Sequence, residues 1–140
     1  MDDNLFYNIE LTARRVKHFG QTQLNKHGFD ITIEQWLVLK LVSENEGITQ
    51  TEIIQQLLKD KPTISRMVKS LVEKGIIAKT GGSGDQRSYS LILSKKGKKL
   101  IDQMIPIIEE IRSQGLGSLS EKEIQASKNT LKKIRNNLGY

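Results

Sequence analysis

The chain has 140 residues and a net charge of +6, from 22 Lys or Arg against 16 Asp or Glu. It contains no cysteine, which excludes disulfides, thiolate metal sites and redox sensing by a thiol. No apolar run approaches the roughly 18 residues of a membrane span, and the polar start of the chain is unlike a signal peptide. We therefore expect a cytoplasmic protein that folds as a single domain over residues 1–140.

The chain is expected to begin with a helix over residues 5–28. Apolar residues recur there at spacings of three and four, at Leu5, Phe6, Ile9, Ala13 and Val16. Farther along, Trp36 stands among leucines and is expected to lie in the core.

A helix–turn–helix is predicted next. Thr49 and Glu52 fit a capping box, and a short helix with one buried face follows at Ile53, Ile54, Leu57 and Leu58. A turn leads to Asp60, the expected N-cap of a second helix over residues 61–74, with Pro62 in its first turn. Gly75 stands where a left-handed residue would end that helix.

After Gly75 the pattern changes from helical to alternating. Residues 76–80 could form a strand, and residues 88–93 alternate with Tyr89, Leu91 and Leu93 on one side. A β-hairpin directly after a helix–turn–helix makes a winged helix. At its Gly-rich tip, Arg87 suits a narrow minor groove, and Asp85 could hold the guanidinium in a bidentate pair.

Two helices are expected to follow the hairpin. Ser94 is the predicted N-cap of a long helix, and Ser120 and Glu123 form a capping box that opens a final helix. Terminal helices this apolar have too little partner surface within one small subunit. We therefore expect residues 5–28 and 94–138 to be dimerisation helices that pair across a two-fold axis.

Positive charge is concentrated in the predicted winged helix. Residues 59–99 contain eleven Lys or Arg and three acids, so this segment is +8 and the other 99 residues sum to −2. Because phosphate binding needs cations on one surface, this distribution predicts nucleic-acid binding.

In order and spacing, these motifs resemble the multiple-antibiotic-resistance regulator (MarR) family. The wing motif is carried by Asp85-Gln86-Arg87 and Leu93-Ser94-Lys95-Lys96-Gly97, and the upstream matches are Ile48–Glu52, Thr63–Val68, Leu71–Ile77 and Thr32–Leu39. The resemblance runs from about residue 5 to 138. It implies a mainly α fold with a small β-hairpin wing, in which a winged helix–turn–helix over residues 32–93 is flanked by the dimerisation helices. Two positions depart from the family pattern: Ile54 replaces a usual Ala, and Leu58 replaces a frequent Gly.

A homodimeric, sequence-specific DNA-binding regulator, more specifically a repressor, is the function we expect. Residues on the second helix of the motif would read base edges or hold phosphates, namely Lys61, Thr63, Ser65, Arg66, Lys69 and Ser70. Gln50 and Thr51 would approach the DNA backbone, and Arg87 with Asp85 the minor groove. Two-fold symmetry predicts a pseudo-palindromic operator with half-site centres about 10 base pairs apart.

The resemblance also implies release by a small phenolic or anionic ligand. Arg14, Arg15, Lys17 and His18 could meet such an anion, or could form only a solvated cationic turn. We expect no enzyme activity, cofactor or metal site, because His18 and His27 lie nine residues apart without a cluster of further ligands. Two alternatives stay open: a non-specific architectural DNA-binding protein, and a winged-helix protein–protein interaction module.

Overall fold

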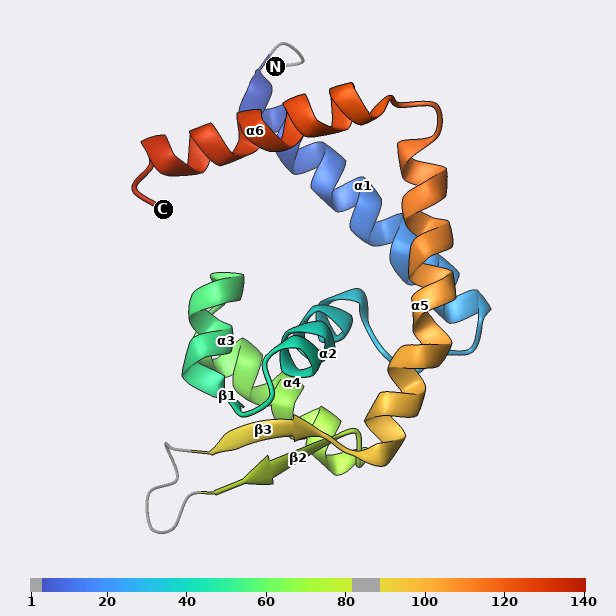
Figure 1. Ribbon diagram of the computed structural model, residues 1–140, viewed down its shortest axis with the longest axis vertical. Coiled ribbons are helices and arrows are strands. Elements are labelled where there is room, and N and C mark those ends of the chain that lie inside the picture. Colours follow the sequence, from blue (N-terminus) through green and yellow to red (C-terminus); the bar gives the residue numbers. More distant parts are fainter. Residues whose placement is uncertain (1–3, 82–88) are drawn as a thin grey trace.

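A computed structural model describes residues 4–81 and 89–140, which form helices around a small antiparallel sheet (Figure 1). The expected fold class, mainly α with a β-hairpin wing, is confirmed. In chain order the elements are α1 (Leu5–Lys26), α2 (Ile33–Glu44), β1 (Ile48–Thr49), α3 (Gln50–Leu57), α4 (Lys61–Glu73), β2 (Ile77–Thr80), β3 (Ser90–Leu93), α5 (Lys95–Leu116) and α6 (Glu121–Asn137).

The predicted helix starts are confirmed by side-chain caps. Thr49 accepts a hydrogen bond from the Glu52 N–H at 3.2 Å and starts α3, and Ser94 starts α5 through the Gly97 N–H at 3.0 Å. The capping box of α6 is complete, with Ser120 and Glu123 bonding each other reciprocally. These short-range bonds satisfy backbone N–H groups that have no partner inside the helix.

The turn between α3 and α4 is tight and places one residue in the left-handed region. Leu58 has φ 51° and ψ 40°, and its side chain is 66% exposed. Glycine tolerates this conformation because it lacks a Cβ, whereas leucine is strained in it. The leucine that stands at position 58, where the family frequently has glycine, therefore strains the backbone of this turn. Gly75 takes φ 73° directly after α4, as predicted.

The sheet has three strands in the order β1-β3-β2. β2 and β3 form the predicted hairpin, with Ile77 opposite Leu93 and Lys79 opposite Leu91. β1 adds a strand that the sequence did not predict, pairing Ile48 with Leu91. A strand of two residues has no periodicity to detect, since its formation depends on a partner more than 40 residues away.

The core lies where α2, α3, α4 and the sheet meet the lower part of α5. Trp36 is 4% exposed, which confirms its predicted place in the core. Gly97, in the first turn of α5, lies so close to the backbone carbonyl of Ile76 that a Cβ would clash with it. The other buried apolar residues include Leu24, Val38, Leu39, Ile53, Ile64, Val68, Leu71, Ile77, Leu91 and Met104.

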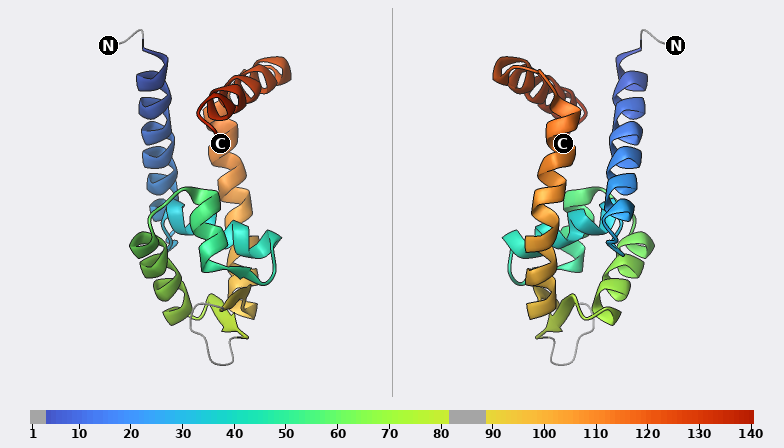
Figure 2. Two further views of the ribbon diagram at one scale, coloured as in Figure 1. Left: turned by 90° about the vertical axis from the view of Figure 1, so that its left-hand side faces the viewer. Right: turned by 90° about the vertical axis from the view of Figure 1, so that its right-hand side faces the viewer.

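The outer helices leave this core. α1 and the upper half of α5 rise from the winged body, and α6 lies across the top of the molecule (Figure 1 and Figure 2). α6 is described throughout, and none of its residues is buried. Within the described part of the chain, no helix has the length and apolar character needed to cross a membrane.

Candidate nucleic-acid interface

The α4 helix has one buried and one exposed side. Ile64, Val68 and Leu71 are fully buried against the neighbouring elements. The other side carries the exposed residues Arg66 and Lys69. The helical period therefore gives α4 a packed side that holds it in place and a charged side that a partner can reach.

The start of α4 is set by Asp60. Its carboxylate accepts a hydrogen bond from the Thr63 N–H at 2.8 Å. This bond lowers the pKa of Asp60, helped by a second bond from the Thr63 side chain and by the positive charge of Arg66. The carboxylate consequently stays ionised at neutral pH and orients the first turn of α4.

The residues of α3 and α4 that are expected to contact DNA differ in their exposure to solvent. Thr51, Lys61, Ser65, Arg66 and Lys69 are exposed, whereas Gln50, Thr63 and Ser70 are half-buried.

Two half-buried hydroxyls on α4 already have partners. The Thr63 hydroxyl interacts with the Asp60 carboxylate and helps to lower its pKa, and the Ser70 Oγ lies 3.5 Å from Nε2 of the buried Gln35 on α2. Both hydroxyls therefore take part in holding α4, which the sequence pattern did not indicate.

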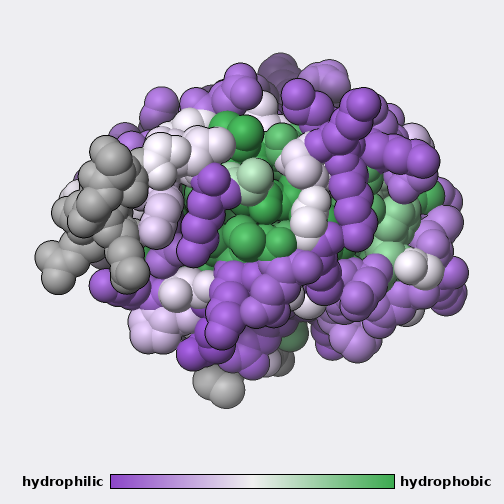
Figure 3. Space-filling model, turned by 90° about the horizontal axis from the view of Figure 1, so that it is seen from below, coloured by the Kyte–Doolittle hydropathy of each residue, from purple (hydrophilic) through white to green (hydrophobic). Residues whose placement is uncertain are grey.

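Asp85 and Arg87, the expected wing contacts, lie outside the described residues. At the base of the hairpin, the Lys79 ammonium lies 5.0 Å from the centre of the Tyr89 ring, within cation–π distance. Seen from below, the molecule presents a largely hydrophilic face around a central apolar strip (Figure 3). A surface of this kind is suited to a polar, charged partner.

Several cationic residues considered in the sequence are engaged with neighbours. On α1, Arg14 bonds Glu10 at 2.7 Å. On α5, Lys96 donates to the backbone oxygen of Lys74 at 2.7 Å. The positive charge of this chain therefore serves partly to tie elements together.

Within residues 4–81 and 89–140, one acidic residue that the sequence analysis did not single out has two ion-pair partners. Glu34 on α2 bonds Lys17 on α1 at 2.6 Å and Lys59 in the α3–α4 turn at 3.2 Å. The hydrogen bond from Lys17 is the main cause that lowers the pKa of Glu34. Lys59 adds to this effect, and partial burial opposes it. Sequence separations of 17 and 25 residues leave no local pattern that could have revealed this bridge.

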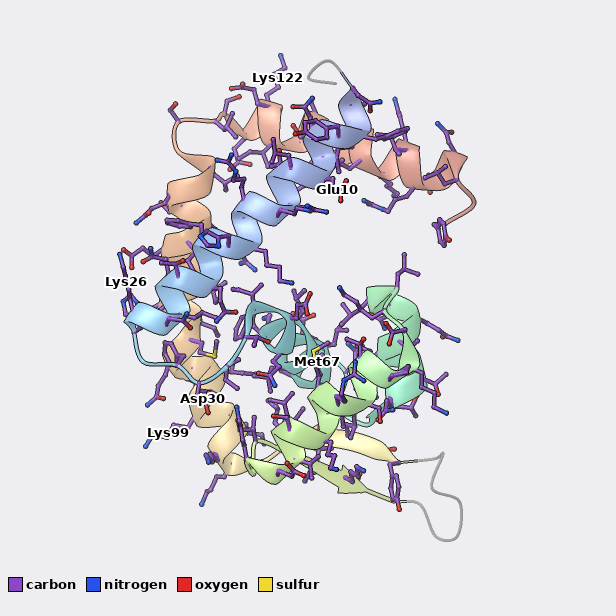
Figure 4. The ribbon with its side chains drawn as sticks, turned by 180° about the vertical axis from the view of Figure 1, so that it is seen from behind. Glu10, Lys26, Asp30, Met67, Lys99 and Lys122 are labelled. Atoms are coloured by element: carbon purple, nitrogen blue, oxygen red, sulfur yellow. The ribbon has the colours of Figure 1, made fainter. Side chains whose placement is uncertain are left out.

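A pocket of about 370 Å³ lies on one flank, between the start of α5, the end of α4 and the residues before α2. Asp30 and Lys99 belong to its lining and lie together on that flank (Figure 4). Among residues 4–81 and 89–140, no group of three His, Cys, Asp or Glu could hold a metal ion.

Comparison with known proteins places this geometry in a family. A family model described as the MarR family matches residues 29–88, which cover α2, the helix–turn–helix and the start of the wing. The transcriptional regulator HosA of Escherichia coli is 25% identical over 107 residues, covering 76% of this chain and 79% of HosA. Over residues 29–88, the chain matches the MarR family. The resemblance seen in the sequence is thereby confirmed.

Solved structures of MarR-like folds agree over almost the whole chain. A chain from Listeria monocytogenes, complexed with 26mer DNA, is 25% identical with a TM-score of 0.84, covering 97% of this chain and 89% of that one. The MepR–DNA complex of Staphylococcus aureus is 26% identical with a TM-score of 0.83, covering 96% and 98%. The members of the family that this chain resembles are transcriptional regulators and not enzymes.

Proposed function

We propose that this MarR-family protein is a homodimeric, sequence-specific DNA-binding repressor that a small-molecule ligand releases from its operator. The observation that carries the proposal is the exposed side of α4, where Arg66 and Lys69 lie beside a wing within a segment of charge +8. The two similar structures solved with DNA support the same reading.

In the proposed complex, α4 enters the major groove. Arg66 donates to a guanine, and Thr63, Ser65 and Ser70 contact base edges or phosphates. Ser65 is the most accessible of these three hydroxyls, since it alone is exposed. Lys61 and Lys69 bind phosphates, and Gln50 and Thr51 contact the DNA backbone. Arg87, held by Asp85, enters the minor groove.

A homodimer would cover the apolar surface that one subunit leaves exposed. On α1, Phe6 is 62% exposed and Val16 is 58% exposed, and Leu138, the C-cap of α6, is 65% exposed. Exposed apolar surface on long terminal helices is typical of an interface between subunits. We therefore assign residues 5–28 and 94–138 to dimerisation and residues 32–93 to DNA binding, and we expect a pseudo-palindromic operator.

Release by a small phenolic or anionic ligand would act through the spacing of the two α4 helices. A ligand that prefers a dimer with the wrong spacing shifts the population away from the DNA-binding form. On α1, Arg14 and Lys17 pair with acids, so we propose the exposed Arg15 and His18 as contacts for an anion. A DNA partner also favours the cytoplasmic location expected from the sequence.

The experiment that tests this function is a fluorescence-anisotropy titration. The protein is titrated against the promoter DNA flanking its own gene and against a scrambled duplex, at several salt concentrations. We expect binding to the promoter at least about a thousandfold tighter than to the scrambled duplex. The logarithm of the binding constant should fall steeply with the logarithm of salt concentration, because phosphate contacts release counterions.

The two alternatives predict different outcomes in the same titration. Equal, salt-sensitive binding to both duplexes would support a non-specific architectural protein. No binding to either duplex at low salt would contradict the DNA-binding proposal and favour a protein–protein interaction module.

A further inference from the structure

The first turn of α2 is the junction between the outer helix α1 and the helix–turn–helix. The Glu34 Oε1 atom accepts from the ammonium groups of Lys17, on α1, at 2.6 Å and of Lys59, in the α3–α4 turn, at 3.2 Å. The Glu34 side chain is only 28% exposed, so the bridge is partly shielded from water. One carboxylate oxygen therefore links three separate segments of the chain.

The residues on either side of Glu34 extend this junction. The Ile33 N–H donates to Oε1 of Gln21 on α1 at 3.0 Å. On the other side, Nε2 of the buried Gln35 lies 3.5 Å from Oγ of Ser70 on α4. Three consecutive residues of α2 thus contact α1, the α3–α4 turn and α4, and they form a continuous path of contacts from α1 to α4.

We infer that Glu34 is a positioning residue, which sets the angle of the helix–turn–helix against α1 and thereby the distance between the two α4 helices of a dimer. The inference rests on the proposed function. Glu34 itself does not need to touch DNA in this arrangement. It acts through Lys59, next to the N-cap of α4, and through Lys17, on a helix assigned to dimerisation.

A merely structural ion pair would behave differently. Partly exposed ion pairs contribute little to stability, and their loss alone should not change which operator spacing is preferred. A positioning role predicts a change in spacing preference, because the two α4 helices are coupled rigidly through α1 and its partner in the dimer.

The test uses the full-length protein and the operator found by footprinting its own promoter. Duplexes are prepared in which the spacer between the half-sites is lengthened or shortened by single base pairs. Glu34→Gln and Lys17→Met should bind the natural spacing roughly threefold or more weakly. They should also discriminate less between the spacings than the parent protein does.

Matched controls come from the same helix. Lys40 and Glu44 form an ion pair at 3.1 Å within α2, which links no second element. Glu44→Gln and Lys40→Met change the net charge by the same amounts and should keep both the affinity and the spacing profile of the parent. The double variant Glu34→Gln/Lys17→Met should bind the operator no more weakly than the weaker of the two single variants. Both single changes already remove the same contact, the one between Lys17 and Glu34.

Parent-like affinity and spacing profile in both Glu34→Gln and Lys17→Met would overturn the inference. So would a loss of affinity that is equal for every spacing and for a scrambled duplex, because this would show a simple charge effect. If the parent protein prefers none of the promoter duplexes, the proposed function itself fails and the inference falls with it. Lys17→Met changes only an exposed side chain, so it keeps the test open if Glu34→Gln does not fold.

Discussion

Arg66 extends from the exposed side of α4, in the second turn of the helix that Asp60 caps. A guanidinium on a firmly capped helix is well placed for two parallel hydrogen bonds to guanine. We expect Arg66→Ala to weaken operator binding by about 1–3 kcal/mol and to relax specificity at one position of each half-site. Anisotropy titrations with operators substituted at single positions would measure both effects.

Lys69→Ala is the control for this prediction. A lysine that holds a phosphate carries no sequence information, so its loss should weaken all duplexes about equally and reduce the salt slope by about 1. Unchanged operator affinity in Arg66→Ala would show that α4 does not read the major groove through this residue.

Leu58 carries backbone strain in the turn before α4. Because its φ is 51° and its side chain is largely exposed, glycine should relieve the strain with little loss of packing. We expect Leu58→Gly to raise the free energy of unfolding by roughly 0.5–1 kcal/mol, after the entropy of the unfolded chain is counted. Urea denaturation would measure this gain, and a lower stability of Leu58→Gly would mean that the side chain packs usefully.

Asp60 should make the stability of the protein depend on pH. Its bond from the Thr63 N–H lowers its pKa in the folded state, so its contribution is complete above the ordinary pKa of about 3.9. That contribution is lost as pH falls through the lower folded pKa. The stability advantage of the parent over Asp60→Ala should therefore shrink in acid, as measured by denaturation at several pH values. Asparagine also caps helices well, so at neutral pH the parent should exceed Asp60→Asn in stability by a smaller margin than it exceeds Asp60→Ala.

At the scale of elements, two glycines of α5 lie in opposite environments. Gly97 packs against the backbone of Ile76, where a Cβ would clash, whereas a Cβ at Gly115 would meet no described atom within 4 Å. We expect Gly97→Ala to destabilise the protein by about 1–3 kcal/mol through overpacking. Gly115→Ala should instead stabilise it by roughly 0.5–1 kcal/mol, since alanine favours helices.

Thermal unfolding of the two alanine variants would test this contrast within one helix. An equal change in both would mean that helix propensity, and not the contact of Gly97 with the Ile76 backbone, controls the stability. The contact also fixes where α5 leaves the winged body, because the Ser94 N–H donates to the Ile76 oxygen at 3.0 Å.

For the whole molecule, the proposed dimerisation is expected to depend on α6 and its C-cap. Leu131 of α6 and Leu138, the C-cap of α6, are exposed in the single chain and lie seven residues apart. We expect Leu131→Lys/Leu138→Lys to convert the dimer into monomers, because four buried charges in the interface would lack partners. Operator affinity should fall sharply when the dimer separates, since each half-site would then be bound by a separate monomer.

Sedimentation velocity of this variant and of Asn129→Lys/Asn136→Lys would test the prediction. The two asparagines have the same spacing but lie on the opposite side of α6, so this control should remain dimeric. Monomeric behaviour of the parent protein would contradict the proposed dimer.

Features set by neighbouring residues could be predicted from the sequence. The caps at Thr49, Asp60, Ser94 and Ser120 each join residues only three positions apart, and the buried side of α4 follows from its helical period. The wing motif and helix–turn–helix could be recognised in order for the same reason. Short-range hydrogen bonds and hydrophobic periodicity leave a signal in any window of about 15 residues.

Long-range contacts were decided only by the tertiary structure. The β1–β3 pair, the Glu34 bridge and the contact of Ser70 with Gln35 join residues between 17 and 43 positions apart. A carboxylate near a helix start has no preferred distant lysine until packing brings one within reach. The sequence by itself therefore determined the elements and the charged side of α4. Packing decided how those elements are joined, because a contact between distant residues forms only after the chain has closed the loop between them.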